Sequence, residues 1–219
     1  MFDHILVYDT ETASLAVEDG IVEHAWIEID DNMDEIERVQ SLIKPEGPIS
    51  FSAMGVHGIT EEMVADAPTM DDHLAGRFWT KSILMVAHNA QFDAKYLRPH
   101  CGMLDTICTL KLARIAYPDA PDHKLPTLLR MLDLPVIGAH NALDDVSTTR
   151  GVLLACAHTL NLDLEGLYEL CKKPQRVEKI GFGKHKGTKV VNLPKDYVKW
   201  LLKQDNVDAN LRWTLENPL

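Results

Sequence analysis

The sequence is poor in cysteine and contains no long hydrophobic run. Its four cysteines show no C-x-x-C spacing, so we expect neither a zinc site nor a disulfide framework. The longest apolar runs resemble ILMVA at 83–87, which is too short for a membrane-spanning helix. The N-terminus carries an acid at position 3 and no basic segment, so no signal peptide is expected. These absences predict a cytoplasmic protein in a reducing compartment.

Basic residues are scarce over most of the chain. The formal net charge is −11, but residues 1–171 hold 11 Lys/Arg against 28 Asp/Glu. Residues 172–203, in contrast, hold 10 Lys/Arg against two acids. An acidic body concentrates cations, whereas a basic segment either meets an anionic polymer or forms a solvated surface. Charge alone leaves these two interpretations of the basic segment open.

Hydrophobic periodicity predicts an α/β domain followed by a smaller one. Strands are expected at 4–12, 21–30, 37–44 and 82–88. Helices are expected at 61–66, 70–81, 91–97, 106–116, 126–132 and 142–160. This order indicates a sheet flanked by helices over 1–165. A linker at 166–179 then leads to a small basic α+β domain at 180–219, with a hairpin at 180–193 and a helix at 195–204.

Acidic residues stand where predicted strands and helices begin or end. Asp9 and Glu11 lie two positions apart at the end of the first strand, so both carboxylates project from one face. Taken alone, this D-x-E pair is a weak signal, and a solvated strand end is the favoured explanation. HNAQFD at 88–93 places Asp93 in the first turn of a helix, where the helix dipole favours an acid without any chemistry.

The segment HNALDD at 140–145 precedes the longest predicted helix. Asn141 is suited to cap the first turn, and Asp144 and Asp145 suit the positive end of the helix dipole. Capping therefore explains these residues on their own. Acids and a histidine nevertheless recur at three element ends, where active sites of α/β proteins gather, and this favours one shared site.

These motifs together resemble the DEDDh family of ribonuclease-H-like 3′→5′ exonucleases. The resemblance rests on DTE at 9–11, HNAQFD and HNALDD, and extends to GVHGIT at 55–60 and CTLKLAR at 108–114. It covers residues 5 to about 155 and implies an α/β fold with a mixed sheet flanked by helices. FGKHKG at 182–187, followed by YVKWLL at 197–202, looks like the small domain in the bacterial exonuclease X branch of the family.

The resemblance implies that four carboxylates bind metal and take part in catalysis, namely those of Asp9, Glu11, Asp93 and Asp145. Oxygen ligands suit Mg²⁺, with Mn²⁺ as a substitute, and four carboxylates match two divalent ions. Two such ions about 3.5–4 Å apart can activate the attacking water and stabilise the leaving 3′-oxygen. The resemblance makes His140 the general base, since an imidazole with a pKa near ~6.5 can take a proton at neutral pH. Asp144 is interpreted as a solvated neighbour and not as a metal ligand.

The predicted activity is release of nucleoside 5′-monophosphates from DNA 3′ ends, with a role in DNA repair or recombination. An enzyme that trims RNA 3′ ends is an alternative, because these motifs do not distinguish ribose from deoxyribose. A catalytically silent nucleic-acid-binding module is a second alternative, which the intact set of reactive groups disfavours.

Substrate contacts are expected from Thr10, Thr12, His57, Lys195 and Lys199. The two threonines adjoin the expected scissile end. His57 either contacts the terminal nucleotide, as the resemblance implies, or is an ordinary core or surface histidine. Lys195 and Lys199 share one helix face and would contact phosphates, unless this domain binds a protein partner or is only a solvated surface. For Trp200, core packing is favoured over base stacking.

Overall fold

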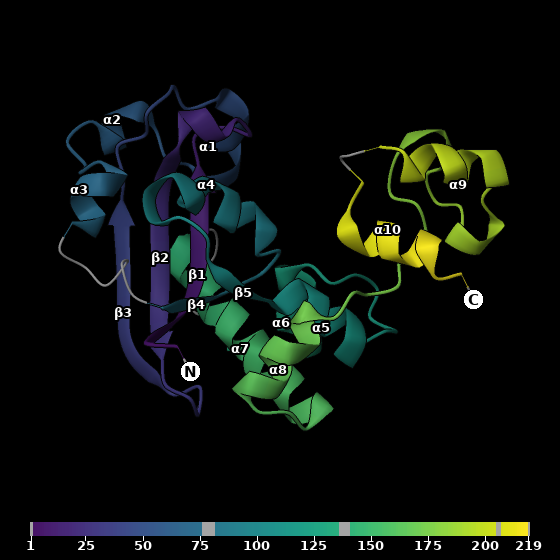
Figure 1. Ribbon diagram of the computed structural model, residues 1–219. Coiled ribbons are helices and arrows are strands. Elements are labelled where there is room, and N and C mark those ends of the chain that lie inside the picture. The colour runs from purple at the N-terminus through teal and green to yellow at the C-terminus, as the bar shows by residue number, and fades with distance from the viewer. Residues whose placement is uncertain (1, 76–81, 136–140, 205–206, 219) are drawn as a thin grey trace. The chain divides into compact units, whose positions relative to one another are not determined.

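A five-stranded mixed sheet organises the N-terminal part of the chain (Figure 1). The computed structural model describes residues 2–75, 82–135, 141–204 and 207–218. The strand order is β3-β2-β1-β4-β5; β1 pairs with β2 and β2 with β3 in antiparallel fashion, whereas β1 and β5 both run parallel to β4. The strands are β1 (His4–Thr12), β2 (Ile21–Ile29), β3 (Glu35–Leu42), β4 (Ile83–Ala87) and β5 (Asp105–Cys108).

Helices pack on both faces of this sheet, because side chains alternate along each strand. Ile5 and Val7 of β1 belong to one core with residues of α5, α6 and α7, whereas Leu6 and Tyr8 belong to another with residues of α3 and α4. The helices are α1 (Phe51–His57), α2 (Glu61–Val64), α3 (Met70–Leu74), α4 (Gln91–Cys101), α5 (Thr109–Ala116), α6 (Leu125–Met131), α7 (Ala142–Leu160) and α8 (Leu164–Lys172), and a 3-10 turn, η1 (Val17–Asp19), follows β1. The predicted mixed sheet flanked by helices is confirmed.

Several predicted boundaries were wrong. The first residues of the helix expected at 106–116 instead form strand β5, in which Ile107 is fully buried in the core, and the helix begins only at Thr109. Helix α1 was missed, since its exposed apolar side chains break the amphipathic pattern. The predicted linker begins too early: residues up to Lys172 belong to α8, whose Leu164 and Leu167 pack into the core beside α7. Residues 76–81 of the expected helix at 70–81 lie outside the described residues.

The chain divides into two compact units, Met1–Cys171 (unit 1) and Lys172–Leu219 (unit 2). Unit 2 contains η2 (Gly183–His185), η3 (Val190–Asn192), α9 (Lys195–Leu202) and α10 (Ala209–Glu216). Its small core includes Leu201 of α9 and Leu211 of α10. The predicted hairpin is reduced to a single antiparallel bridge between Lys179 and Lys189, because 3-10 turns occupy most of the expected strands. Over the described ranges, no helix combines the length and apolarity needed to cross a membrane.

Candidate active site

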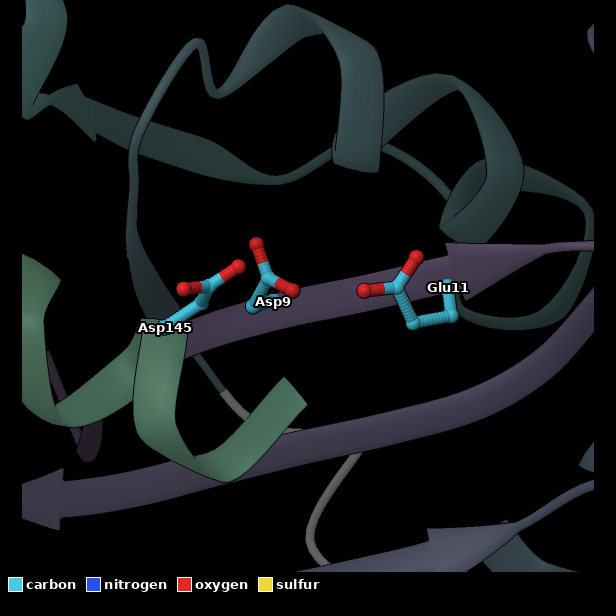
Figure 2. Close-up of side chains that lie close together, drawn as sticks. All are labelled: Asp9, Glu11 and Asp145. Atoms are coloured by element: carbon cyan, nitrogen blue, oxygen red, sulfur yellow. The ribbon is translucent and has the colours of Figure 1, made fainter. Parts of the chain in front are cut away.

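Three carboxylates from two elements meet at the end of β1 (Figure 2). Asp9 and Glu11 have the same parity along β1 as Val7, so they project from the face that α7 covers. Asp145 reaches the same place from the first turn of α7. One oxygen of each carboxylate lies within 4.8 Å of the others. Such a group of oxygen donors is suited to share a hard divalent cation.

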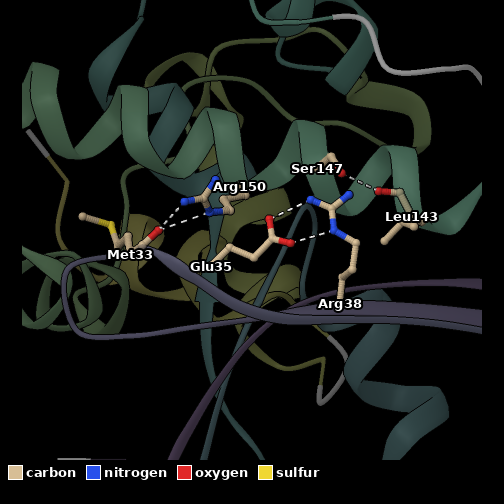
Figure 3. Close-up of polar contacts among 6 residues, drawn as sticks. All are labelled: Met33, Glu35, Arg38, Leu143, Ser147 and Arg150. Atoms are coloured by element: carbon tan, nitrogen blue, oxygen red, sulfur yellow. Dashed lines mark hydrogen bonds and ion pairs between the residues drawn. The ribbon is translucent and has the colours of Figure 1, made fainter.

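The start of α7 is fixed by its cap and by a contact to the β2–β3 turn. Asn141 Oδ1 accepts a hydrogen bond from the Asp144 backbone N–H at 2.9 Å. Further along α7, Arg150 donates from Nε and Nη2 to the Met33 carbonyl at 3.1 and 2.8 Å (Figure 3). The cap sets where α7 begins, and the Arg150 contact holds α7 against the β2–β3 turn. Capping and site formation are therefore compatible explanations of HNALDD.

Asp144, the neighbour of Asp145, takes part in the cap. Its Oδ2 accepts a hydrogen bond from Asn141 Nδ2 at 2.7 Å, and its side chain is half-buried. The sequence-based interpretation of Asp144 as a merely solvated residue is therefore wrong, because its carboxylate stiffens the helix entrance. It is not among the three carboxylates that share the cluster.

Asp93 lies in the first turn of α4 and is 2% exposed. Its Oδ1 accepts hydrogen bonds from Thr10, at 3.1 Å from the backbone N–H and 2.9 Å from the hydroxyl. Burial raises the pKa of Asp93 to about 7, although the hydrogen bonds from Thr10 act in the opposite direction. Both donors of Thr10 are thus directed to Asp93, which differs from the substrate contact expected for this threonine.

Repulsion among the carboxylates sets the electrostatics of the site. Burial, followed by the charges of Asp93, Asp145 and Glu11, raises the pKa of Asp9 well above its ordinary value. Burial, followed by the charge of Asp145, raises the pKa of Glu11 to about 7. A nearby divalent cation would favour the ionised forms and relieve this repulsion. The donor set therefore fits a divalent metal ion.

A further carboxylate, Glu23, was not predicted. It lies on β2 opposite Glu11, is 7% exposed, and adds to the charge that raises the pKa of Glu11. Its Oε1 accepts from Gln40 Nε2 at 2.9 Å, and its Oε2 accepts from the Ala142 N–H at 3.1 Å. Glu23 therefore ties β2 to the start of α7. The signal in the sequence was an acid inside the apolar stretch IVEHAWIEID.

A pocket of about 320 Å³ adjoins Glu11. Its lining includes Glu11, Thr12, Leu15, Val56, His57 and Phe92. Leu15 and Val56 are 80% and 70% exposed, so the pocket has accessible apolar walls. His57 Nδ1 accepts from the Ile59 N–H at 3.0 Å, and burial lowers the pKa of this imidazole. The structure thus brings His57 and Thr12 to one pocket beside the carboxylates.

His140, Lys195 and Lys199 complete the set of expected site residues. His140, which directly precedes the α7 cap, lies outside the described residues, so its role stays a prediction. Lys195 and Lys199 are exposed on α9 in unit 2. His88 binds the Thr109 hydroxyl at 3.0 Å and a backbone carbonyl at 2.8 Å, so both ring nitrogens hold the turn after β4.

Residues 6–153, which include this whole constellation, match the family model described as Exonuclease. The chain belongs to the exonuclease family. It is 33% identical over 224 residues to Exodeoxyribonuclease 10 of Escherichia coli (strain K12), and the match covers 97% of each protein. These findings confirm the resemblance to DEDDh 3′→5′ exonucleases, so the protein is an enzyme of that class.

Solved structures agree with this membership. The structure of Exonuclease X in complex with 5′ overhanging duplex DNA is 32% identical, with a TM-score of 0.65 over 76% of this chain and 99% of that one. The nuclease domain of 3′hExo, a DEDDh family member bound to rAMP, shares the fold at 18% identity, with a TM-score of 0.56 over 72% of this chain and 92% of that one. The ribonuclease-H-like fold is thus confirmed. In unit 2, residues 175–216 match a second family model, described as Putative quorum-sensing-regulated virulence factor.

Proposed function

We propose that this exonuclease is a divalent-metal-dependent 3′→5′ exodeoxyribonuclease that releases nucleoside 5′-monophosphates from DNA 3′ ends. The observation that carries the proposal is the cluster of Asp9, Glu11 and Asp145 in a chain of this family. DNA as the substrate is supported by the match to Exodeoxyribonuclease 10 along nearly the whole chain. A role in DNA repair or recombination is consistent with this activity.

Two Mg²⁺ ions are the proposed cofactors, with Mn²⁺ as a substitute. Asp9, Glu11, Asp93 and Asp145 would hold them, because carboxylates are the ligands that these hard cations prefer. When bound, the ions supply positive charge that stabilises the attacked phosphate and the leaving 3′-oxygen. Asp9 stands between Asp145 and Glu11 in Figure 2 and is therefore suited to serve both ions.

Protein groups around the cluster have separate proposed tasks. His140 would accept the proton of the attacking water, as a base with a pKa near neutrality can do efficiently. Thr10 keeps the Asp93 carboxylate oriented through two hydrogen bonds. The pocket beside Glu11 would receive the terminal nucleotide, with Leu15 and Val56 against the base and His57 at its polar edge.

A labelled-strand assay tests the proposal. Oligonucleotides labelled at the 5′ end, as single-stranded DNA, recessed duplex DNA and RNA, are incubated with Mg²⁺, Mn²⁺ or EDTA. We expect stepwise shortening of DNA from its 3′ end with release of nucleoside 5′-monophosphates, dependent on metal. Faster shortening of RNA would replace the proposal with an exoribonuclease, and binding without cleavage in either metal would replace it with a silent binding module.

A further inference from the structure

Three aromatic rings pack together at the surface of unit 2. The ring centroids of His185 and Tyr197 are 4.3 Å apart, and those of Tyr197 and Trp200 are 5.4 Å apart with an interplanar angle of 22°. Trp200 is 51% exposed, so the expectation that it packs in the core was wrong. Leu201, its neighbour on α9, occupies the core instead. With Lys184, these rings line a pocket of about 610 Å³, here called the aromatic pocket.

The FGKHKG motif builds one wall of the aromatic pocket. Gly183 and Gly187 have φ angles of +62° and +84°, which glycine adopts without strain, and the Gly187 N–H donates to the Ile180 carbonyl at 2.7 Å. A Cβ atom at Gly183 would lie 3.4 Å from the Tyr197 hydroxyl oxygen, so this loop runs close to α9. It thereby brings the Lys184 ammonium to 5.6 Å from the centre of the Tyr197 ring.

Three further lysines lie close in the sequence to residues that line this pocket. Lys186 continues the loop, while Lys199 and Lys203 stand one position before and three positions after Trp200. All three side chains are exposed, and the spacing of three residues places Lys203 on the same side of α9 as Trp200. One acid, Asp196, also lines the pocket. Lysines are thus concentrated in the segments that carry Lys184 and the exposed Trp200.

We propose that the aromatic pocket binds single-stranded nucleic acid, with bases stacked on Trp200 and Tyr197 and phosphates contacted by Lys184, Lys199 and Lys203. Base stacking needs an accessible ring face, which Trp200 offers, and every base has a π-face, so binding would be independent of sequence. An acidic peptide would use the lysines without needing the stacked rings. The choice of nucleic acid rests on the proposed function, because unit 1 would act on the same polymer.

Binding without metal separates this proposal from catalysis. The full-length protein in EDTA is titrated into a fluorescein-labelled dT20, and anisotropy is followed over a salt series. Trp200→Ala should weaken binding about fivefold or more, because alanine cannot stack on a base. Lys199→Ala and Lys203→Ala should each make the slope of log affinity against log salt concentration shallower by about 0.7. This is the contribution of one phosphate contact on a single strand.

Matched variants control for general loss of charge or apolar surface. Val191→Ala removes another exposed apolar side chain of unit 2, which is 63% exposed, and Lys44→Ala removes an exposed lysine of unit 1. Both should bind dT20 like the wild type. Trp200→Phe should retain most of the affinity, since phenylalanine also stacks, but should lose the quenching of tryptophan emission by the oligonucleotide. Circular dichroism checks that each variant is folded.

Two results would overturn the proposal. One is an affinity of folded Trp200→Ala equal to that of the wild type, together with a salt dependence of Lys199→Ala and Lys203→Ala equal to that of the wild type. The other is equally tight binding to poly-glutamate, insensitive to Trp200→Ala, which would assign the lysines to an acidic protein partner. Failure of the proposed function would show separately, as absence of nucleotide release by the wild type in Mg²⁺ while the binding to dT20 in EDTA still depended on Trp200.

Discussion

Unit 1 and unit 2 distribute their charges in opposite ways. In unit 1, three carboxylates lie at half-buried positions within 4.8 Å of one another, and burial and repulsion raise the pKa values of Asp9 and Glu11. In unit 2, the lysines of α9 stay exposed beside an aromatic ring. Concentrated carboxylates favour a compact divalent ion, whereas dispersed lysines favour a polymer of phosphates. The overall charge of −11 therefore combines two regions whose charges suit different ligands.

This difference has a kinetic consequence. Removing a charge from the carboxylate cluster should act on turnover, because the proposed ions would stabilise the reacting phosphate. Removing a charge from unit 2 should act on affinity and on its salt dependence. Cluster variants that changed only affinity would contradict this division of roles between the two units.

The largest effect is expected from Asp9→Asn and Asp145→Asn. Each should abolish nucleotide release, because a ligand to the proposed ions is lost. Each should also raise the melting temperature in EDTA, since one repelling charge is removed from the cluster. Asp66→Asn, at an exposed position of unit 1, is the matched control and should retain activity. Equal stabilisation of Asp9→Asn and wild type by Mg²⁺ would place the metal elsewhere.

A smaller loss is expected from His140→Ala. Turnover should fall about 10²–10⁴-fold, which is the usual contribution of a general base. Stabilisation by Mg²⁺, measured as the shift in melting temperature, should persist because the carboxylates remain. The wild-type rate should rise as pH passes the imidazole pKa, and this rise should disappear in the variant. Unchanged turnover with an unchanged pH profile would remove this histidine from the mechanism.

The smallest effect concerns stability of the metal-free protein. Burial raises the pKa of Glu11 from 4.5 and that of Asp93 from 3.8, in both cases to about 7. Between the ordinary pKa of each carboxyl group and its raised pKa in the folded state, the folded protein binds more protons than the unfolded chain. The free energy of unfolding should therefore fall as pH rises from about 4 to about 8. Urea titrations in EDTA should show a loss on the order of 1 kcal/mol or more.

Two comparisons sharpen this measurement. Glu11→Gln should flatten the decline with pH, because the neutral amide does not titrate. Mg²⁺ should oppose the decline, since a cation stabilises the ionised carboxylates. A free energy of unfolding that rises over the same pH range in EDTA would contradict the raised pKa values.

Local patterns were sufficient to predict much of the site. Alternation along a strand placed Asp9 and Glu11 on one face, and the capping preference of asparagine located the start of α7 at Asn141. Both rules act over a few residues, so they hold whatever the rest of the chain does. The order of strands and helices similarly indicated the α/β class, although β5 and α8 show that tertiary packing overrides local periodicity at element boundaries.

Local sequence patterns alone indicated which elements present the candidate side chains, because strand alternation and helix capping involve only neighbouring residues. Only the tertiary structure decided that Glu23 lies opposite Glu11 and contacts the start of α7, because strand register and helix packing join residues that are far apart in the chain. The same holds for Thr10, whose hydrogen bonds to Asp93 require β1 and α4 to pack together. Trp200 is exposed because its neighbour Leu201 occupies the small core of unit 2, a choice made by three-dimensional packing rather than by residue type.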